Sequence, residues 1–330
     1  MAVMLGLDAL HGVISTLDAI GLLDASLVHE AAGRTFVSPK YVTDFEGGAM
    51  RMLFAADYEA GYFATKAYHN IQGVGTRYVV SLYRLRDGAL LALLDGGLIT
   101  DLRTGAASGV IARKVPVAGP VTVGILGSGH QARTQLASLA AVYPVASAAV
   151  FSPNAGHREA YARATSATLG IEVTPVASAE EAVRGKSVVA AASSARGKEP
   201  ILRGEWLAGC RLLCAVGNTR KQFAEVDTQC FRDAKLVVMD SVHALEEAGE
   251  LVQAVKAGAL PESKRATLAQ VATGSVAVPP DGLVVFKSVG TALQDLSLAA
   301  RYFELVGKRA TLPSASDVAS LKQQVPTKAK

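Results

Sequence analysis

Hydrophobic and polar positions follow a helical spacing and then a strand-like alternation in the first third of the chain. The helical spacing covers residues 17–32, and the alternating segments cover residues 50–55, 61–68, 78–85 and 89–94. Between the last two segments stands Asp87-Gly88, a pair that favours a hairpin with a primed turn because its residues tolerate a positive φ. The pattern predicts a meander of strands, followed by a helix over residues 103–113.

From residue 119 onward, short apolar runs alternate with amphipathic stretches, which is typical of parallel strands joined by crossover helices. The predicted strands are VTVGIL, ASAAVF, IEVTPV, SVVAAA, RLLCAV and LVVMD. After Pro279 and Pro280 a further strand, a turn and an apolar helix lead back toward the first domain. We therefore predict an α/β protein, with a Rossmann-type doubly wound parallel sheet inserted into a smaller α+β domain.

Composition excludes several classes of protein. The 330 residues are 50% hydrophobic and 19% charged, which allows a sizeable core in two domains. The net charge of +4 comes from 33 basic and 29 acidic residues without a long basic stripe, so we expect no nucleic-acid partner. No window reaches the ~18 apolar residues of a membrane span, and no targeting segment is evident, so we expect no membrane partner and a cytoplasmic location.

The three cysteines are Cys210, Cys214 and Cys230, and the first two lie in an apolar run. We expect buried, reduced thiols. The Cys210/Cys214 pair has no histidines at a ligand spacing, so we expect no metal site.

A phosphate-binding turn follows the strand VTVGIL and precedes the helical RTQLASLAAV. Its first glycine permits a tight turn, its second lets a pyrophosphate approach the backbone, and its small last residue lets the helix pack on the strand. An ordinary tight turn is the alternative, but strand, turn, helix and second strand occur in the order of a dinucleotide site. The turn consists of Gly127, Ser128, Gly129, His130, Gln131 and Ala132.

The end of the second strand favours NADP(H) over NAD(H). Ser152 stands where an acidic residue normally binds the ribose 2′-hydroxyl, and Asn154 and Arg158 follow on the same loop, so a 2′-phosphate would be tolerated. A polar, solvated loop is the alternative, which leaves NAD possible. Ser193, after the strand SVVAAA, completes the predicted cofactor contacts of this part of the chain.

The segment GLITDLRTGAAS, residues 97–108, closely resembles the ornithine cyclodeaminase and mu-crystallin family. GILGSGHQA, AVGNTRKQFAEVD and FKSVGTALQDL agree with this family as well, and the resemblance extends over nearly the whole chain from Lys66 onward. It implies a homodimer and an active site between two domains. On this basis we assign residues 1–115 with 285–330 to a substrate-binding and dimerisation domain, and residues 116–284 to the NAD(P)-binding Rossmann domain.

The resemblance also implies hydride transfer to or from the α-carbon of a small amino or imino acid. Arg103 is the expected anchor of the substrate carboxylate, because a planar guanidinium can hold both carboxylate oxygens. Lys66 resembles the catalytic lysine of the family and would bind the same carboxylate or donate a proton to the imine nitrogen, a role that water also fills. Without the resemblance, Arg103 would be a surface charge and Lys66 an edge-strand lysine.

Further residues are assigned by the same resemblance. Lys40 occupies the position of a second family arginine. Thr76, in the turn before YVVSLY, and Ser288 with Val289 resemble residues that contact the nicotinamide end, where Arg103 is also expected.

Asn218 departs from the cyclodeaminases of the family, which carry an aspartate at this position for proton exchange. Asn218 is still expected to contact substrate and cofactor, but an amide cannot accept that proton. The segment MRMLFAA also offers no carboxylate for a second amine. We therefore favour an imine or ketimine reductase or an amino-acid dehydrogenase. The alternatives are a cyclodeaminase, a lyase that uses NAD catalytically, and a non-catalytic NADP-binding protein of mu-crystallin type.

Overall fold

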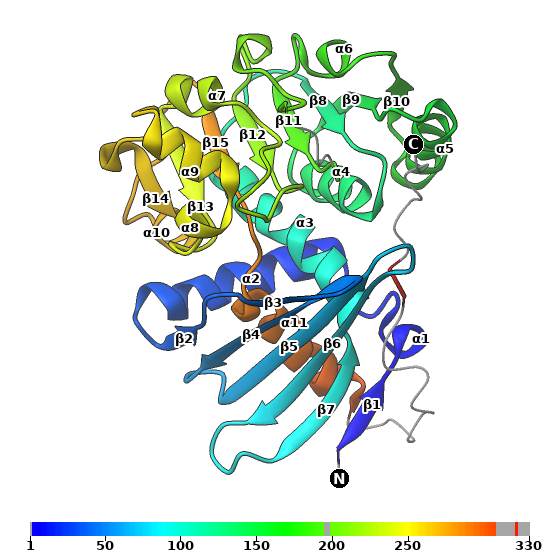
Figure 1. Ribbon diagram of the computed structural model, residues 1–330, viewed down its shortest axis with the longest axis vertical. Coiled ribbons are helices and arrows are strands. Elements are labelled where there is room, and N and C mark those ends of the chain that lie inside the picture. Colours follow the sequence, from blue (N-terminus) through cyan, green and yellow to red (C-terminus); the bar gives the residue numbers. More distant parts are fainter. Residues whose placement is uncertain (1, 195–198, 308–320, 323–330) are drawn as a thin grey trace. The chain divides into compact units, whose positions relative to one another are not determined.

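The computed structural model describes residues 2–194, 199–307 and 321–322 (Figure 1). Its contacts divide the chain into two compact units. Unit 1 comprises Met1–Arg103 and Thr291–Lys330, and unit 2 comprises Thr104–Gly290. Unit 2 is thus an insertion into unit 1 along the sequence, and helix α3 (Gly96–Lys114) runs through the first boundary. Within the described ranges, no helix is long and apolar enough to cross a membrane.

The functions assigned to residues 1–115 with 285–330 and to residues 116–284 stay predictions. Within the last stretch of the first assignment, residues 308–320 and 323–330 lie outside the described residues.

The sheet of unit 1 is a meander extended by short strands at both sides. Its order is β1-β7-β6-β5-β4-β2, with β3 also paired to β4 and β16 to β6. The β1–β7 pair is parallel and the other pairs are antiparallel. The strands are β1 (Val3–Leu5), β2 (Thr35–Val37), β3 (Tyr41–Phe45), β4 (Gly48–Asp57), β5 (Tyr62–Ile71), β6 (Gly75–Arg84), β7 (Leu90–Asp95) and β16 (Leu321–Lys322).

The predicted meander corresponds to β4 through β7, whereas β1, β2 and β3 were not predicted. The hairpin between β6 and β7 is present, but its turn is not of the primed two-residue kind. Gly88 has a φ of +69°, whereas no residue other than glycine has a positive φ in the described chain. The loop is closed by hydrogen bonds from Gly88 N to Arg84 O and from Arg84 N to Ala89 O, so it is longer than the prediction.

The helices of unit 1 are α1 (Leu7–Leu10), α2 (Thr16–Ala31) and α11 (Ala292–Leu305). α2 begins where Ser15 and Asp18 form a reciprocal capping box, in agreement with the helix predicted over residues 17–32. α11 buries an apolar face against β4, β5 and α2. The inner face of the sheet is therefore covered by the helix that carries the C-terminal signature of the sequence.

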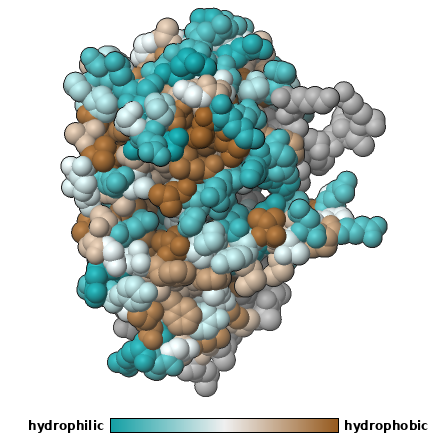
Figure 2. All heavy atoms as spheres, turned by 60° about the vertical axis from the view of Figure 1, so that its left-hand side comes forward, coloured by the Kyte–Doolittle hydropathy of each residue, from teal (hydrophilic) through white to brown (hydrophobic). Residues whose placement is uncertain are grey.

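The outer face of the same sheet is rich in exposed apolar side chains. Phe54 of β4 stacks on Phe36 and on Tyr41, with ring centroids 6.2 and 5.5 Å apart. Met50 and Met52 of β4 are 42% and 40% exposed, although methionine is usually buried. Figure 2 displays one face of the molecule, on which brown apolar side chains reach the surface among polar ones.

Unit 2 contains a fully parallel sheet with the order β10-β9-β8-β11-β12-β15-β13-β14. The chain moves outward from β8 to β10 and then returns to β11 on the other side of β8, which is the switch point of a doubly wound sheet. The predicted Rossmann-type fold is confirmed. The strands are β8 (Val121–Leu126), β9 (Val145–Phe151), β10 (Glu172–Pro175), β11 (Val188–Ala191), β12 (Leu212–Ala215), β13 (Leu236–Met239), β14 (Arg265–Thr267) and β15 (Val284–Lys287).

Helices and 3-10 turns connect these strands. They are α4 (His130–Val142), α5 (Ala155–Leu169), α6 (Ala179–Val183), η1 (Gly204–Trp206), α7 (Thr228–Asp233), α8 (Ala244–Glu247), α9 (Gly249–Lys256), η2 (Glu262–Lys264) and α10 (Leu268–Ala272). α3 begins seven residues before the predicted helix over residues 103–113.

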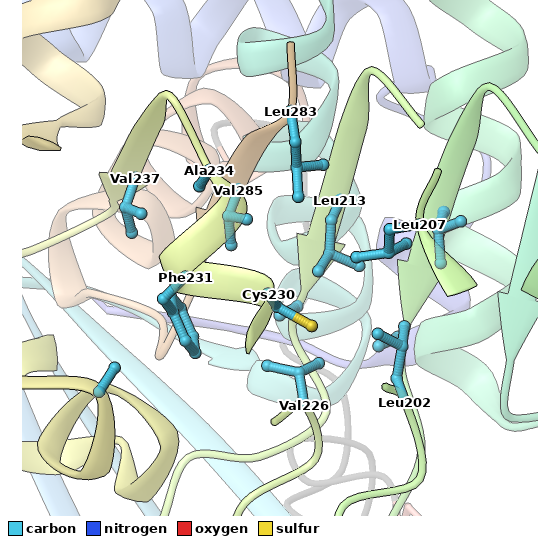
Figure 3. Close-up of a cluster of buried hydrophobic side chains, with 14 of the residues drawn as sticks. Leu202, Leu207, Leu213, Val226, Cys230, Phe231, Ala234, Val237, Leu283 and Val285 are labelled. Carbon is cyan, nitrogen blue, oxygen red and sulfur yellow. The ribbon is translucent and has the colours of Figure 1, made fainter. Parts of the chain in front are cut away.

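The core of unit 2 gathers on one side of its sheet. Figure 3 shows Leu213, Val237 and Val285, from three neighbouring strands, with Phe231 and Cys230 of α7 beside them. All three cysteines are buried and free, as predicted. Burial raises the pKa of the Cys210 and Cys214 thiols to about 12, which keeps them protonated and unreactive.

Candidate functional site

Two clusters of predicted site residues form in the structure, one in each unit. In unit 1, strand register brings the polar residues of three strands to one end of the inner face. Arg51 of β4 pairs with Tyr68 of β5, which pairs with Tyr78 of β6. Lys66 lies two residues from Tyr68 on β5 and therefore points to the same face.

Lys66 is held in a buried polar environment. Its side chain is 2% exposed, and Nζ donates to Oδ1 of Asp295 at 2.7 Å and to Oγ1 of Thr100 at 2.6 Å. Nζ also lies 5.1 Å from the ring centroid of Tyr78 and 5.8 Å from that of Tyr68, within cation–π range. This burial contradicts the alternative of an edge-strand lysine.

Arg103 is also buried, with 8% of its surface exposed, so it is not a solvated surface charge. Its Nε donates to Oδ1 of Asp295 at 3.3 Å, and its Nη1 donates to Oε1 of Gln294 at 3.2 Å. Two consecutive residues of α11 thus fix the plane of the guanidinium. Because Asp295 contacts both Arg103 and Lys66, it places the two predicted carboxylate anchors side by side.

Sequence reasoning missed Asp295, Arg51 and the two tyrosines. The signal for Asp295 was a lone carboxylate inside the apolar helix LQDLSLAARYF, and the signal for Arg51 was its inward position in the alternating strand MRMLFAA. Tyr78 contributes a neutral phenol, because burial raises the pKa of its hydroxyl well above the usual value.

Thr76 and Lys40 differ in their position in the fold and in their burial. Thr76 is the second residue of β6, not part of a turn as predicted, and its Oγ1 accepts a hydrogen bond from Nδ2 of Asn70 at 2.8 Å. Register places it on the same face as Tyr78. Lys40 lies half-buried in the connection between β2 and β3. The predicted roles of both residues stay predictions.

In unit 2, the turn after β8 has the geometry that a pyrophosphate requires. Gly127 has a φ of +113°, and a Cβ there would lie 2.5 Å from the carbonyl oxygen of Ala192. Gly129 is the N-cap of α4 and makes no side-chain cap, and a Cβ built on it would meet nothing within 4 Å. Ala132 is fully buried against its surroundings. The second glycine therefore leaves open space beside a helix N-terminus, which fits a bound dinucleotide.

The other residues of the turn lie around this opening. Ser128 and Gln131 are half-buried, and His130 is exposed. His130 thus lies at the surface of the turn, and its predicted contact with the cofactor stays a prediction.

The loop after β9 carries the residues that we expect to meet the ribose. Oγ of Ser128 donates to Oγ of Ser152 at 2.9 Å, which joins this loop to the phosphate turn. Nη1 of Arg158 donates to the carbonyl oxygen of Ser152 at 3.0 Å, so the guanidinium lies over the end of the strand. Oδ1 of Asn154 accepts from the His157 amide at 3.0 Å and caps α5. Asn154 therefore has a structural role of its own.

Glu225 connects the carboxyl ends of strands β11 and β12. Its Oε1 accepts from the Ser193 amide at 2.6 Å and its Oε2 from the Gly217 amide at 2.9 Å. The carboxylate thereby joins the loops after β11 and β12. Burial raises the pKa of Glu225 to about 7, an effect that neighbouring Lys287 and the Ser193 hydrogen bonds oppose. Sequence reasoning did not single out Glu225.

Asn218 organises its own loop. Its Nδ2 donates to the carbonyl oxygens of Phe223 at 2.6 Å and Arg220 at 3.1 Å and to the carboxylate of Glu250, and its Oδ1 accepts from the Arg220 amide at 3.0 Å. Nζ of Lys287 lies 2.7 Å from Oε1 of Glu250. An asparagine suits position 218 because the carboxylate of an aspartate there would lie against the carboxylate of Glu250. The predicted contacts of Asn218 with substrate and cofactor stay predictions.

Asp240 holds the turn that follows β15. Its carboxylate accepts from Oγ of Ser288 at 2.6 Å and from the amides of Val289 and Gly290, the latter at 2.7 Å. The hydroxyl of Ser288 is thus engaged inside the protein. Ser288 and Val289 are fixed in position by a buried carboxylate, which suits residues predicted to line a cofactor.

The family of the chain follows from a comparison of its sequence with family models. The model described as "Ornithine cyclodeaminase/mu-crystallin family" matches residues 2–308. The chain belongs to this family. The match includes the first 60 residues, where the resemblance assigned Lys40 alone.

Individual relatives agree with this assignment. A solved structure of Thermococcus litoralis Δ1-pyrroline-2-carboxylate reductase, in complex with NADH and L-proline, has a TM-score of 0.88 and 28% identity, covering 93% of this chain and 98% of that one. Ketimine reductase mu-crystallin of Mus musculus is 30% identical over 225 residues, or 68% of each chain. Alanine dehydrogenase of Archaeoglobus fulgidus is 27% identical over 306 residues, covering 90% of this chain and 92% of the relative.

The two glycines of the phosphate turn should respond differently to an added methyl group. We predict that Gly129→Ala keeps the stability of the protein but weakens NAD(P)H binding at least ~10-fold, because the methyl occupies the space that a pyrophosphate needs. Gly127→Ala should instead lower the free energy of unfolding by ~2 kcal/mol or more, because it forces a positive φ on alanine and a clash. Urea unfolding and fluorescence titration measure the two effects, and unchanged cofactor affinity in Gly129→Ala contradicts the assigned site.

Proposed function

We propose that the protein is an NAD(P)-dependent oxidoreductase that reduces the C=N bond of a small α-imino acid or oxidises the corresponding α-amino acid. The observation that carries this proposal is the buried pair of cations, Lys66 and Arg103, oriented together by Asp295. Buried cations in contact with one shared carboxylate form a site for a further anion, and the carboxylate of an amino or imino acid supplies it. The relatives that reduce imines or dehydrogenate amino acids support the same reaction class.

The reaction requires one hydride and one proton. When bound at the turn from Gly127 to Ala132, NAD(P)H would supply the hydride for the α-carbon of the imine, and the electron pair of the C=N bond would move to nitrogen and take up a proton. In this scheme Arg103 orients the substrate carboxylate, and Lys66 binds the same carboxylate or delivers the proton from Nζ, with water as the other source. The turn from Gly127 onward holds the pyrophosphate through backbone amides.

No observation favours the two alternatives. A cyclodeaminase needs a proton-exchanging acid at position 218, and Asn218 is engaged with Glu250 and its own loop. It also needs a group for a second amine, but β4 presents Arg51 diagonally opposite Lys66. The inward carboxylate of β4, Asp57, is at the far end of the strand and contacts His29. A protein that only binds NADP has no need for two buried cations.

Replacement of Arg103 tests the proposed substrate anchor. Arg103→Lys should retain NAD(P)H affinity but lower kcat/KM for the imino acid at least ~100-fold, or ~2.7 kcal/mol, because lysine cannot hold both carboxylate oxygens. Activity is followed by NAD(P)H absorbance with α-keto acids plus ammonia or methylamine, and with cyclic imines. Arg113→Lys, an exposed position on the same helix, is the matched control. Near-normal turnover of a folded Arg103→Lys protein would refute the anchor.

We further propose that NADP(H) is bound at least as tightly as NAD(H). The support is Ser152 in place of an acid and the guanidinium of Arg158 at the Ser152 carbonyl oxygen. Fluorescence titration should show no preference for NADH above about tenfold, which corresponds to ~1.4 kcal/mol. Ser152→Asp should shift the preference toward NADH, because a carboxylate repels a 2′-phosphate and binds a 2′-hydroxyl. A marked NADH preference of the unaltered protein contradicts this assignment.

We also propose a homodimer that covers the outer face of the unit 1 sheet. Exposed Met50, Met52 and Tyr41 form an apolar surface of the kind that is buried in subunit contacts. Met52→Lys should therefore shift the protein from dimer to monomer in sedimentation velocity, because a charge would be placed in an apolar contact. Val255→Lys, an exposed apolar position in unit 2, is the control and should leave the mass unchanged. A dimer unaffected by Met52→Lys excludes this face.

A further inference from the structure

The inner face of the unit 1 sheet carries a third buried cation, Arg51, that the proposed reaction does not use. Arg51 is 8% exposed, and Cζ of its guanidinium lies 5.6 Å from the ring centroid of Tyr68. Among the described residues, none forms a hydrogen bond or an ion pair with the guanidinium of Arg51. A buried guanidinium normally has a hydrogen-bonded anionic partner, so Arg51 is suited to receive one from a ligand.

Arg51 is placed close to the carboxylate anchors. Its Cζ lies near the same Tyr68 ring as Nζ of Lys66, at 5.6 and 5.8 Å from the centroid. Strand register puts Leu53 opposite Lys66 and Arg51 opposite Tyr68, so Arg51 and Lys66 are diagonal neighbours on one face. Long side chains in this relation can reach two ends of one small molecule.

Among the described ion pairs of the site, cations outnumber carboxylates, which favours a ligand with more than one carboxylate. Asp295 contacts Lys66 and Arg103, so one protein carboxylate serves two cations. The α-carboxylate of the substrate balances the second positive charge of this pair. The charge of Arg51 is then left for another anionic group.

We propose that the substrate is a dicarboxylic imino or amino acid, whose side-chain carboxylate is bound by Arg51. This inference rests on the proposed function and names the substrate class of the same site. Lys66 and Arg103 hold the α-carboxylate, the hydride adds to the same α-carbon, and Arg51 acts as a specificity residue. The tyrosine ring beneath Arg51 limits the directions that its guanidinium can take.

The first experiment compares substrates that differ by one carboxylate. With ammonia and NADPH or NADH, we expect kcat/KM to be at least ~30-fold higher for oxaloacetate and α-ketoglutarate than for pyruvate and α-ketobutyrate. Arg51→Met, which keeps an unbranched apolar stem, should lower kcat/KM for the dicarboxylic substrates at least ~30-fold and change it less than ~3-fold for the monocarboxylic ones. Arg77→Met, on the exposed face of the same sheet, should change neither.

Equal losses with both substrate classes would mean that Arg51 binds the α-carboxylate, and they would overturn the inference. A preference of the unaltered protein for monocarboxylic substrates would overturn it as well. In both cases the proposed function stands, since imines are still reduced. Arg51→Lys retains the charge and should therefore retain part of the preference for dicarboxylic substrates. This variant keeps the test valid if Arg51→Met misfolds. The affinity for NADPH shows whether each variant is folded.

Calorimetry gives a result that does not depend on turnover. With saturating NADPH, succinate should bind at least ~10-fold more tightly than propionate, and Arg51→Met should remove this difference. Failure to reduce any imine, combined with this binding pattern, would reject the proposed function and keep the dicarboxylate site. Equal affinities for succinate and propionate would reject the site.

Discussion

The carboxylate of Asp295 is the contact on which the unit 1 site depends. It lies between Lys66 and Arg103, which come from a strand and a helix far apart in the sequence. Because an unpaired buried charge is strongly destabilising, α11 has to pack on the sheet in the register that brings Asp295 to both cations. The apolar face of α11 supplies the buried surface, and its buried carboxylate, Asp295, fixes the alignment of the helix.

Unit 2 uses carboxylates in a different way. Glu225 and Asp240 accept hydrogen bonds from backbone amides and fasten the loops after β11, β12 and β15. At the phosphate turn, Gly129 leaves open space at the N-terminus of α4. Fixed loops around a helix N-terminus that begins at a glycine form a rigid frame for an anionic cofactor, so binding costs little reorganisation.

The sequence predicted those parts of the fold that have a long, regular pattern. Strands β4 to β7 and β8 to β13 follow from alternation or from apolar runs, and the phosphate turn follows from its place between strand and helix. The short strands β1 to β3 have three to five residues, too few to establish a period, and β3 is exposed along its whole length. Their pairing depends on neighbours that the local sequence does not reveal.

Site residues were predictable where a motif carried them and hidden where only packing defines them. Lys66 and Arg103 were found, but their shared partner Asp295 is 192 residues from Arg103. Arg51 occupies an inward position of an alternating strand, so its burial could have been inferred from the pattern that predicted β4. The structural role of Asn218 could not, because it depends on Glu250, 32 residues away.

The contact between Asn218 and Glu250 decides whether an acid that exchanges protons can be accommodated at position 218. An acid at position 218 would stand against the carboxylate of Glu250, which already pairs with buried Lys287. Such a change would bring a second negative charge to one buried cation, and one of the two acids would have to take up a proton or move. A proton-exchanging residue at this position therefore requires changes in its surroundings as well. Position 218 and Arg51 thus belong to different buried charge networks, one in each unit.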